Sequence, residues 1–481
     1  MSNHTVEKIG GTTMSRADEL VDTLFLKRNE AGDLYNRVFV VSAFGGITNL
    51  LLEDKKTGAP GAFGLFAASD SHLGWSDALD KAAEEMAAVH GRLLSHPADR
   101  KIADDFLRER IEGARSCLID LQRLCSYGHF QLNEHMMTIR ELLSGLGEAH
   151  SAHATALLLQ RGGLNARFVD LTGWRDESQP TLDERIDRAL ADVELASEMP
   201  IVTGYAQCSE GLVRLFDRGY SEVTFARIAA ATVAQEAVFH KEFHLSSADP
   251  KIVGATSVRK IGQTNFDVAD QLSNLGMEAI HPRAAKTLRQ AGIPLRVANA
   301  FDAGDPGTLI DAALSGEPRV EIVTGLNVLA LEVFEQDMVG VKGYDATILK
   351  ALTRHKVRIV SKNSNANTIT HYVDASLKAV RRVEDEISQA YPSARVHVRK
   401  VALVSAVGRN MEGVQAGLRG AVALDETGID TIAMQQSGRP VDVQFIIATD
   451  QKDDAICVLH RALVENGEST LRQPTVVRSA A

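Results

Sequence analysis

The sequence predicts an α/β protein: a mainly parallel β-sheet flanked by helices, followed by two smaller units at the C-terminus. Short apolar strands run into glycine turns that open helices, and this order predicts the parallel sheet. Near the C-terminus the order strand, helix, strand, strand, helix occurs twice, which predicts a duplicated ferredoxin-like fold.

The composition is that of a multidomain globular protein, with 481 residues, 44% of them hydrophobic and 24% charged. Lys and Arg number 52 against 63 Asp and Glu, and the net charge of -11 argues against a nucleic-acid binder held by phosphate contacts. The four cysteines form no CxxC pair, so we expect reduced thiols. No apolar run approaches the roughly 20 residues that span a bilayer, and no signal-peptide pattern begins the chain. We therefore expect a cytoplasmic protein that binds neither membrane nor nucleic acid.

The N-terminal elements alternate as a parallel sheet requires. Strands are predicted over residues 4–9, 37–42, 166–170, 199–203, 237–243 and 294–297. Helices are predicted over residues 15–29, 75–96, 100–127, from about 137 to 159, and over 182–195, 223–236 and 267–275. The dense helical periodicity of residues 76–126 predicts a helical insertion, at about 60–135, over the sheet.

The C-terminal region contains the two similar passages. The first has strands at 320–323, 329–333, 357–361 and 368–373, with helices at 344–354 and 376–390. The second has strands at 397–406, 430–435 and 441–448, with helices at 411–424 and 452–464. We therefore predict a domain over residues 1–312, ferredoxin-like units over 318–393 and 394–468, and a flexible tail over 469–481.

The first glycine turn, KIGGTT at residues 8–13, follows the first strand. Glycines let backbone amides approach phosphoryl oxygens, the next helix adds partial positive charge, and Lys8 would neutralise charge during phosphoryl transfer. An ordinary strand-to-helix turn with a surface lysine explains the same spacing.

Three further turns carry polar side chains. Ser42 and Thr48 flank a double glycine, and their hydroxyls suit either a carboxylate ligand or helix capping. Glu148 follows a glycine within a helix and could bind an ammonium group, although a solvent-facing glutamate is the usual case. Arg218 stands beside a helix start, and its guanidinium suits a carboxylate.

In this order the turns resemble the motifs of aspartate kinases. KIGGTT resembles KFGGTS, SAFGGITN at 42–49 resembles SAxxGxTN, and GEAHS at 147–151 resembles GExxS; RGYSE at 218–222, DPK at 249–251, HPR at 281–283 and residues 299–310 stand where the family has RGGSD, DPR, HPR and NxF...PGTxI. The resemblance covers residues 4–310 and extends to about 465 through two ACT-like units. It implies an amino-acid-kinase-like three-layer αβα sandwich, ATP with Mg as cofactor, and a homodimer formed through the ACT-like units.

The resemblance also implies roles for individual residues. Lys8 would stabilise the transferring phosphoryl group and Glu222 would orient Lys8 or the metal–phosphate unit; Ser42, Thr48, Glu148, Arg218 and Ser221 would bind L-aspartate; Gly10, Gly11, Thr12, Lys241, Asp249 and Lys251 would bind the nucleotide. Because the acceptor carboxylate is already ionised, no general base is needed. No preformed metal cage is expected.

Several positions depart from the family pattern. Tyr220 replaces a glycine and Glu222 an aspartate of RGGSD, while the loop 240–244 reads HKEFH where TDVDG is usual. Glu278 replaces a lysine, so we predict that it lies beside Lys241, although independent drift of two exposed side chains explains the same exchange. The phrases HKEFHLSSADP (240–250) and ADQLSNLGMEAIHP (269–282) resemble aspartate kinases of ectoine biosynthesis.

Other readings stay open. An aspartate kinase that feeds lysine, threonine or methionine synthesis differs only in regulation, and a non-catalytic ACT-type amino-acid sensor would need no nucleotide. A relative of N-acetylglutamate or carbamate kinase would share the fold. Effector loops are expected around Met338, Asn363 and Asn365, where an asparagine-rich run replaces the family's Ser-Ser-Glu. We therefore expect weak or no feedback by lysine and threonine.

Overall fold

A computed structural model describes residues 3–27, 34–68, 72–216, 219–277, 279–302, 304–313 and 317–466. The chain forms two compact units: the first comprises Met1–His244 and Ile280–Ala312, the second Leu245–Ala279 and Ala313–Ala481. Segment 245–279, which falls within the predicted domain 1–312, thus packs with the second unit. Ala248 is buried in the C-terminal core there, and Ile252 and Val253 pack against it. No helix of the described residues is long and apolar enough to cross a membrane.

The first unit is built on a sheet whose strands follow the order β3-β4-β2-β1-β5-β7-β8. All neighbours are parallel except β7 and β8, which confirms the predicted mainly parallel sheet. The strands are β1 Thr5–Ile9, β2 Arg37–Val41, β3 Ala166–Val169, β4 Met199–Thr203, β5 Glu236–Lys241, β7 Leu295–Asn299 and β8 Thr308–Asp311.

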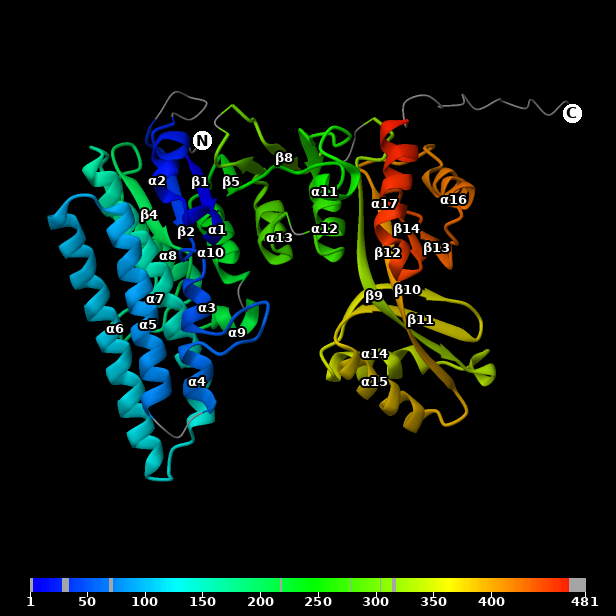
Figure 1. Cartoon of the computed structure of the whole chain (residues 1–481), viewed down its shortest axis with the longest axis horizontal. Coiled ribbons are helices and arrows are strands. Elements are labelled where there is room, and N and C mark those ends of the chain that lie inside the picture. Colours follow the sequence, from blue (N-terminus) through cyan, green and yellow to red (C-terminus); the bar gives the residue numbers. More distant parts are fainter. Residues whose placement is uncertain are drawn as a thin grey trace, which may run out of the picture. The chain divides into compact units, whose positions relative to one another are not determined.

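Helices cover both faces of this sheet (Figure 1). They are α1 Gly11–Met14, α2 Ala17–Leu20, the π-helical η1 Val21–Phe25, α3 Ile47–Leu51, α4 Ala62–Ala68, α5 His72–Leu93, α6 Pro97–Ser126, α7 Leu132–Arg161, α8 Leu182–Leu190, α9 Leu212–Phe216, α10 Tyr220–Ala231 and α13 Pro282–Ala291. The predicted helix 223–236 therefore begins earlier and ends earlier than expected. Val233, at φ 53°, lies just beyond its C-terminus in a conformation that a helix cannot continue.

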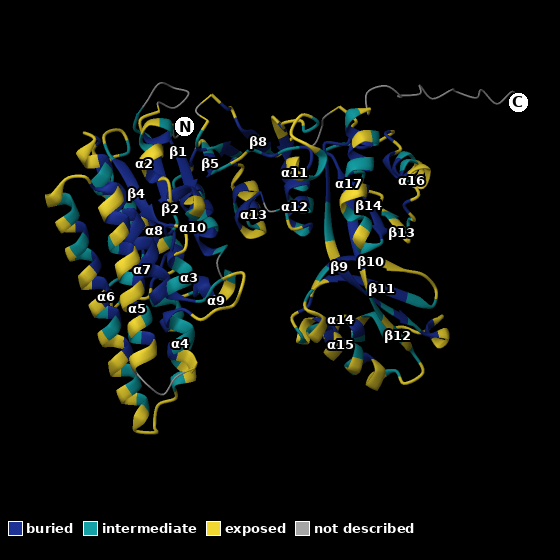
Figure 2. Cartoon of the chain, viewed as in Figure 1, coloured by how far each residue is buried: buried dark blue, intermediate teal, exposed yellow. Residues whose placement is uncertain are grey.

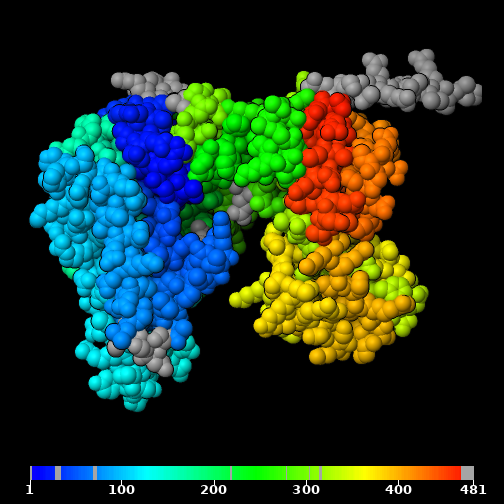
Figure 3. Space-filling model, viewed as in Figure 1, coloured from blue at the N-terminus to red at the C-terminus, as the bar shows by residue number. Residues whose placement is uncertain are grey.

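The helical insertion consists of α4, α5 and α6 with the start of α7, and its long helices pack side by side as one block (Figure 3). Their outward faces are exposed and their inward faces buried (Figure 2). Histidines pack where the insertion meets the second half of α7: the His90 and His150 ring centroids lie 4.7 Å apart, and His150 Nε2 lies 3.1 Å from the Met86 carbonyl oxygen. His153 stacks on Phe106, with 4.0 Å between ring centroids.

The second unit contains a six-stranded sheet of order β10-β11-β9-β12-β14-β13, preceded by α11 Pro250–Val253, β6 Gln263–Asn265 and α12 Phe266–Asn274. Its strands are β9 Ile322–Phe334, β10 Arg358–Ser364, β11 Thr368–Asp374, β12 Arg395–Val407, β13 Ala433–Gln436 and β14 Asp442–Ile447. Its helices are η3 Gln336–Met338, α14 Tyr344–Arg354, α15 Leu377–Ala390, α16 Ala416–Glu426, η4 Thr449–Gln451, α17 Lys452–His460 and η5 Arg461–Glu465.

Two ferredoxin-like halves share the long strands β9 and β12, which pair with each other from Ile322–Val407 to Phe334–Arg395. One core contains Leu329, Leu331 and Val333 from the second half of β9. The other contains Val323 from the first half of β9 together with residues of β12, β14 and α17. The predicted duplication is confirmed. The two strands predicted at 320–323 and 329–333 form one strand, β9, because β9 pairs with β12 along its whole length.

Candidate active site

The predicted catalytic turns meet at one edge of the first sheet. Ile9 is in register with Val41 of β2 and with His240 of β5, so the loops after these parallel strands leave the sheet together. Gly11 lies where the first two loops touch: a Cβ atom there would be 2.8 Å from the Ala43 carbonyl oxygen. A glycine is therefore required for this approach.

Lys8 is buried at the centre of this edge, with 3% of its surface exposed. Its Nζ donates a hydrogen bond to Ser42 Oγ at 3.3 Å, and Ser42 Oγ lies 3.3 Å from Ser221 Oγ. Nζ also lies 4.4 Å from the centroid of the Phe239 ring. Burial lowers the pKa of Lys8, while the negative charges of Glu222, Glu148 and Glu242 raise it.

Glu148 reaches the same place from the middle of α7, where small residues let the helix approach the loops. A Cβ atom at Gly147 would lie 3.0 Å from the Ala43 Cβ. Ser151, one turn further, donates a hydrogen bond to the Ser42 carbonyl oxygen at 2.8 Å. Burial raises the pKa of Glu148 to about 7, although Lys8, the Tyr220 hydroxyl and the amides of Tyr205 and Ala43 lower it.

Five other predicted residues of the first unit lie within the described part of the chain: Glu222, Thr48, Gly10, Thr12 and Lys241. Glu222 accepts a hydrogen bond from the His281 amide at 2.5 Å. Thr48 is half-buried in α3, Gly10 precedes α1, and Thr12 is exposed. Lys241 Nζ lies 4.7 Å from the centroid of Phe239, the ring that Lys8 also contacts.

Other predicted residues belong to the second unit or are not described. Asp249 and Lys251 are exposed in the second unit, where the Asp249 side chain accepts the Lys251 amide and caps α11. Met338 is buried in the first ferredoxin-like core, and Asn363 is exposed on β10. Asn365 accepts the amides of Asn367 and Thr368 in a turn. Arg218 and Glu278 lie outside the described residues, so the predicted Lys241–Glu278 pair stays a prediction.

Two contributors were not predicted from the sequence. Glu242 accepts a hydrogen bond from Thr13 Oγ1 at 2.9 Å, and its charge raises the pKa of Lys8. Its only sequence signal is the acid within HKEFH. Tyr220 lowers the pKa of Glu148, and its only sequence signal is the replacement of a glycine.

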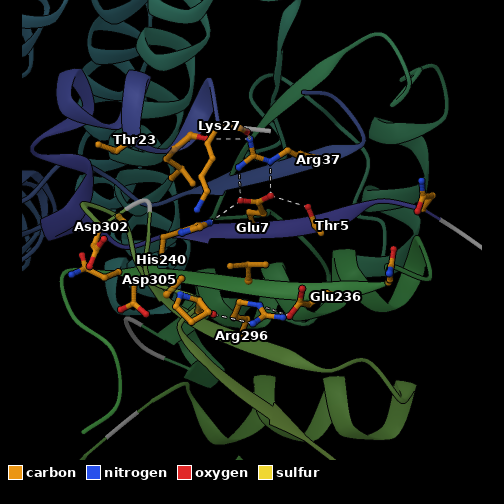
Figure 4. A pocket seen from close by; sticks show the side chains of 18 residues that line it. Thr5, Glu7, Thr23, Lys27, Arg37, Glu236, His240, Arg296, Asp302 and Asp305 are labelled. Atoms are coloured by element: carbon orange, nitrogen blue, oxygen red, sulfur yellow. Dashed lines mark hydrogen bonds and ion pairs between the residues drawn. The ribbon is translucent and has the colours of Figure 1, made fainter. Parts of the chain in front are cut away.

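A cavity of about 390 Å³ lies on the opposite face of the same sheet (Figure 4). Successive residues of a strand point to opposite faces, so Glu7 enters this cavity while Lys8 faces the site described above. Glu7 accepts hydrogen bonds from Arg37 and lies 2.7 Å from His240 Nε2. Burial alone would raise the pKa of Glu7, but Arg37 and His240 hold it well below its ordinary value. Because Glu7 is paired with Arg37 and His240, its carboxylate is not left unpaired in the cavity.

Comparison with known proteins agrees with the fold. The chain is 50% identical over 464 residues to "Aspartate kinase Ask_Ect" of Stutzerimonas stutzeri, covering 96% of this chain and 98% of that one. The crystal structure of E. coli aspartokinase III in complex with aspartate and ADP (R-state) superposes with a TM-score of 0.70 at 18% identity, covering 96% and 100% of the two chains. Clostridium acetobutylicum aspartate kinase gives a TM-score of 0.67 at 17% identity over 96% and 100%. The amino acid kinase family matches over residues 3–299, and the chain belongs to this family.

Proposed function

We infer that the protein is an ATP-dependent aspartate kinase, which transfers the γ-phosphoryl group of ATP to the side-chain carboxylate of L-aspartate. The products are 4-phospho-L-aspartate and ADP. One observation carries this inference beyond the family: Lys8, Ser42, Glu148 and Ser221 converge on one buried spot at the edge where the glycine loops meet. The relative named an aspartate kinase supports it across almost the whole chain.

The site offers charge neutralisation and positioning, which is what phosphoryl transfer to a carboxylate requires. An oxygen of the aspartate side chain attacks the γ-phosphorus, and the bond to the β–γ bridging oxygen breaks with ADP as the leaving group. No proton moves, because the acceptor is already an anion. The Lys8 ammonium neutralises charge on the transferring group, and its burial strengthens that interaction.

Aspartate carries three charged groups, and each has a partner in the site. Glu148 receives the ammonium group, because it is a buried carboxylate with an oxygen that has no hydrogen-bond partner among the described residues. Arg218, with the hydroxyls of Ser42, Thr48 and Ser221, receives the main-chain carboxylate. The side-chain carboxylate of the bound aspartate then faces Lys8.

A second set of residues binds the nucleotide. Gly10, Gly11 and Thr12 line the phosphates, while Lys241, Asp249 and Lys251 contact the rest of the nucleotide. Magnesium enters bound to ATP as part of the substrate, and Glu222 orients Lys8 or the metal–phosphate unit. The protein acts as a homodimer through its ACT-like units in the cytoplasm.

The pathway we propose is ectoine synthesis. The phrases at residues 240–250 and 269–282 support it, as does the name Ask_Ect of the half-identical relative. Ectoine genes beside the gene for this chain would agree with it, whereas a neighbourhood of lysine or threonine genes would favour the alternative pathway.

The test is aspartate-dependent phosphoryl transfer by the purified full chain. We expect ADP formation with MgATP that requires aspartate, and an equal amount of acyl phosphate trapped by hydroxylamine. Glutamate, one methylene longer, and the variant Lys8→Met serve as controls and should give little product. ADP formation without aspartate dependence, or none at all, would rule out the kinase and favour the amino-acid sensor.

A further inference from the structure

Two lysine ammonium groups of the candidate active site lie against one aromatic ring. Lys8 Nζ is 4.4 Å and Lys241 Nζ is 4.7 Å from the centroid of the Phe239 ring. Phe239 is in register with Lys8 on the neighbouring strand β5, and Lys241 follows two residues later. All three side chains therefore leave the same face of the sheet, and one ring contacts both cations.

The Phe239 ring is held from several sides. Only 3% of the residue's surface is exposed. The ring of Phe225, from α10, lies 6.4 Å away between centroids. The first glycine loop passes close to it as well, because a Cβ atom at Gly10 would lie 3.9 Å from Phe239 Cε2. A ring packed between β5, α10 and this loop is a rigid support for the two cations.

A ring supports an ammonium group differently from a carboxylate. The face of the ring attracts a cation, most strongly where water is excluded, yet the ring carries no net charge. Lys8 is itself 3% exposed, and its Nζ donates a hydrogen bond to Ser42 Oγ at 3.3 Å. Burial lowers the pKa of Lys8, so a neighbour that favours the charged amine acts against that effect. The ring does so without cancelling the charge, and the N–H groups not bonded to Ser42 can donate to phosphoryl oxygens.

We propose that Phe239 is a positioning residue of the phosphoryl-transfer site, whose ring holds the ammonium groups of Lys8 and Lys241 towards the phosphates of ATP. This inference rests on the proposed function, in which Lys8 neutralises charge on the transferring group. Phe239 acts through the two lysines and touches no reacting atom. The usual TDVDG motif has an aspartate where this chain has Lys241, so the second cation on the ring belongs to this chain's departure from the motif.

The experiment replaces Phe239 in the full chain by phenylalanines that carry one, two and three fluorine atoms on the ring, introduced by nonsense suppression. Fluorine changes the shape of the ring little, but it withdraws negative charge from the face and so weakens the attraction for a cation step by step. We expect kcat/KM for ATP to fall with each fluorine, by about 10-fold for the trifluorinated ring. A kcat/KM that stays constant along the series would overturn the proposal, because a ring that only fills space tolerates fluorine.

Phe239→Leu removes the ring and keeps an apolar side chain. We expect it to lower kcat/KM for ATP by about 30-fold, and wild-type kinetics in this variant would also overturn the proposal. The matched control is the same fluorinated series at Phe66, a fully buried ring of the same unit whose centroid lies 5.4 Å from that of Trp75. Its kcat/KM should stay constant. A decline at Phe66 as steep as at Phe239 would overturn the specific role.

The series is repeated in a Lys241→Met background to separate the two cations. If the ring holds both lysines, the effect of fluorine on kcat/KM for ATP becomes smaller in this background but remains, because Lys8 is still on the ring. An effect that disappears completely would show that the ring does not act on Lys8, and the proposal would fall.

Lys8→Met separates this proposal from the function itself. If Lys8→Met loses phosphoryl transfer while the fluorinated series and Phe239→Leu keep the wild-type kcat/KM, Phe239 has no positioning role and the kinase assignment stands. If Lys8→Met transfers the phosphoryl group at the wild-type rate, the catalytic site is wrongly assigned, and the role of Phe239 falls with it.

Discussion

The Arg37 guanidinium donates two hydrogen bonds to the Glu7 carboxylate, from Nε to one oxygen at 2.6 Å and from Nη2 to the other at 2.9 Å. The two side chains are 4% and 5% exposed, and Arg37 Nη1 also donates to the Leu24 and Lys27 carbonyl oxygens. The pair thus ties β1 and β2 to the end of η1 on the sheet face opposite Lys8.

Arg37→Met should destabilise the fold strongly, because it leaves the buried Glu7 carboxylate without its cation. We expect a loss of about 3–5 kcal/mol in the free energy of unfolding, measured by denaturant titration of the full chain. The control Lys101→Met removes one partner of an exposed pair, with Lys101 80% exposed, and should cost less than about 0.5 kcal/mol. Equal losses in the two variants would contradict a structural role for the Glu7–Arg37 pair.

Lys8→Met should keep the fold and lose catalysis. The methionine fills similar volume, but it cannot neutralise charge on the transferring phosphoryl group, so kcat should fall by about 10²–10³-fold. Steady-state rates and circular dichroism of the same preparations test both statements. A variant with near-normal kcat would assign Lys8 a structural role only.

Gly11→Ala should separate the first two glycine loops, because the added Cβ would lie 2.8 Å from a main-chain oxygen that cannot turn away. We expect kcat/KM to fall for both ATP and aspartate, since Ser42 belongs to the displaced loop. The control is Gly91→Ala in α5, where a Cβ atom meets no heavy atom within 4 Å. Kinetics that are equal in the two variants would show that the loops need no close approach.

The histidines of α7 that pack against the insertion should make stability fall at mildly acid pH. Burial lowers the pKa of His153 to about 4 and that of His150 well below 6.5. The unfolded chain therefore takes up protons first, and stability declines as the pH falls from about 6.5 towards 4. His150→Leu should flatten the decline in melting temperature between these values, whereas His129→Leu, at an exposed position, should leave the slope unchanged. A slope that His150→Leu does not alter would contradict the assignment.

Lysine and threonine should inhibit weakly or not at all. In the predicted effector region Lys362 Nζ lies 2.5 Å from Asp345 Oδ2, so the acid near the start of α14 is already paired with a cation of this chain. Initial rates at saturating and at low aspartate should stay constant as either amino acid is added to millimolar concentration. Strong inhibition by either one would show that the asparagine-rich loop still forms an effector site.

Much of the site could be predicted because its residues follow strands at fixed motif spacing. Lys8 and Ser42 lie at the ends of two neighbouring parallel strands, which bring them to one edge of the sheet, and Glu148 reaches the same edge from α7. Tyr220 and Glu242 could not be predicted, because their roles arise from packing between α10, α7 and β5 rather than from spacing.

The domain layout was harder to predict for a similar reason. Segment 245–279 follows kinase motifs in sequence, and only the apolar contacts of Ala248, Ile252 and Val253 show that it packs with the C-terminal unit. The long strand β9 was predicted as two strands, over 320–323 and 329–333, and Gly325 lies between them, where a glycine inside a strand indicates close approach rather than a break. A Cβ atom at Gly325 would lie 3.2 Å from the Leu403 carbonyl oxygen of β12.

The sharing of β9 and β12 by both ferredoxin-like halves has a consequence for synthesis on the ribosome. Val323 emerges first, yet its core includes Leu459 and Leu463, which are translated much later. The nascent chain must hold the first half of β9 uncovered until then, and an exposed apolar strand edge is prone to aggregation. A premature stop codon anywhere in α17 would therefore disable the earlier half of the sheet as well, and no single cut in the gene yields two intact halves.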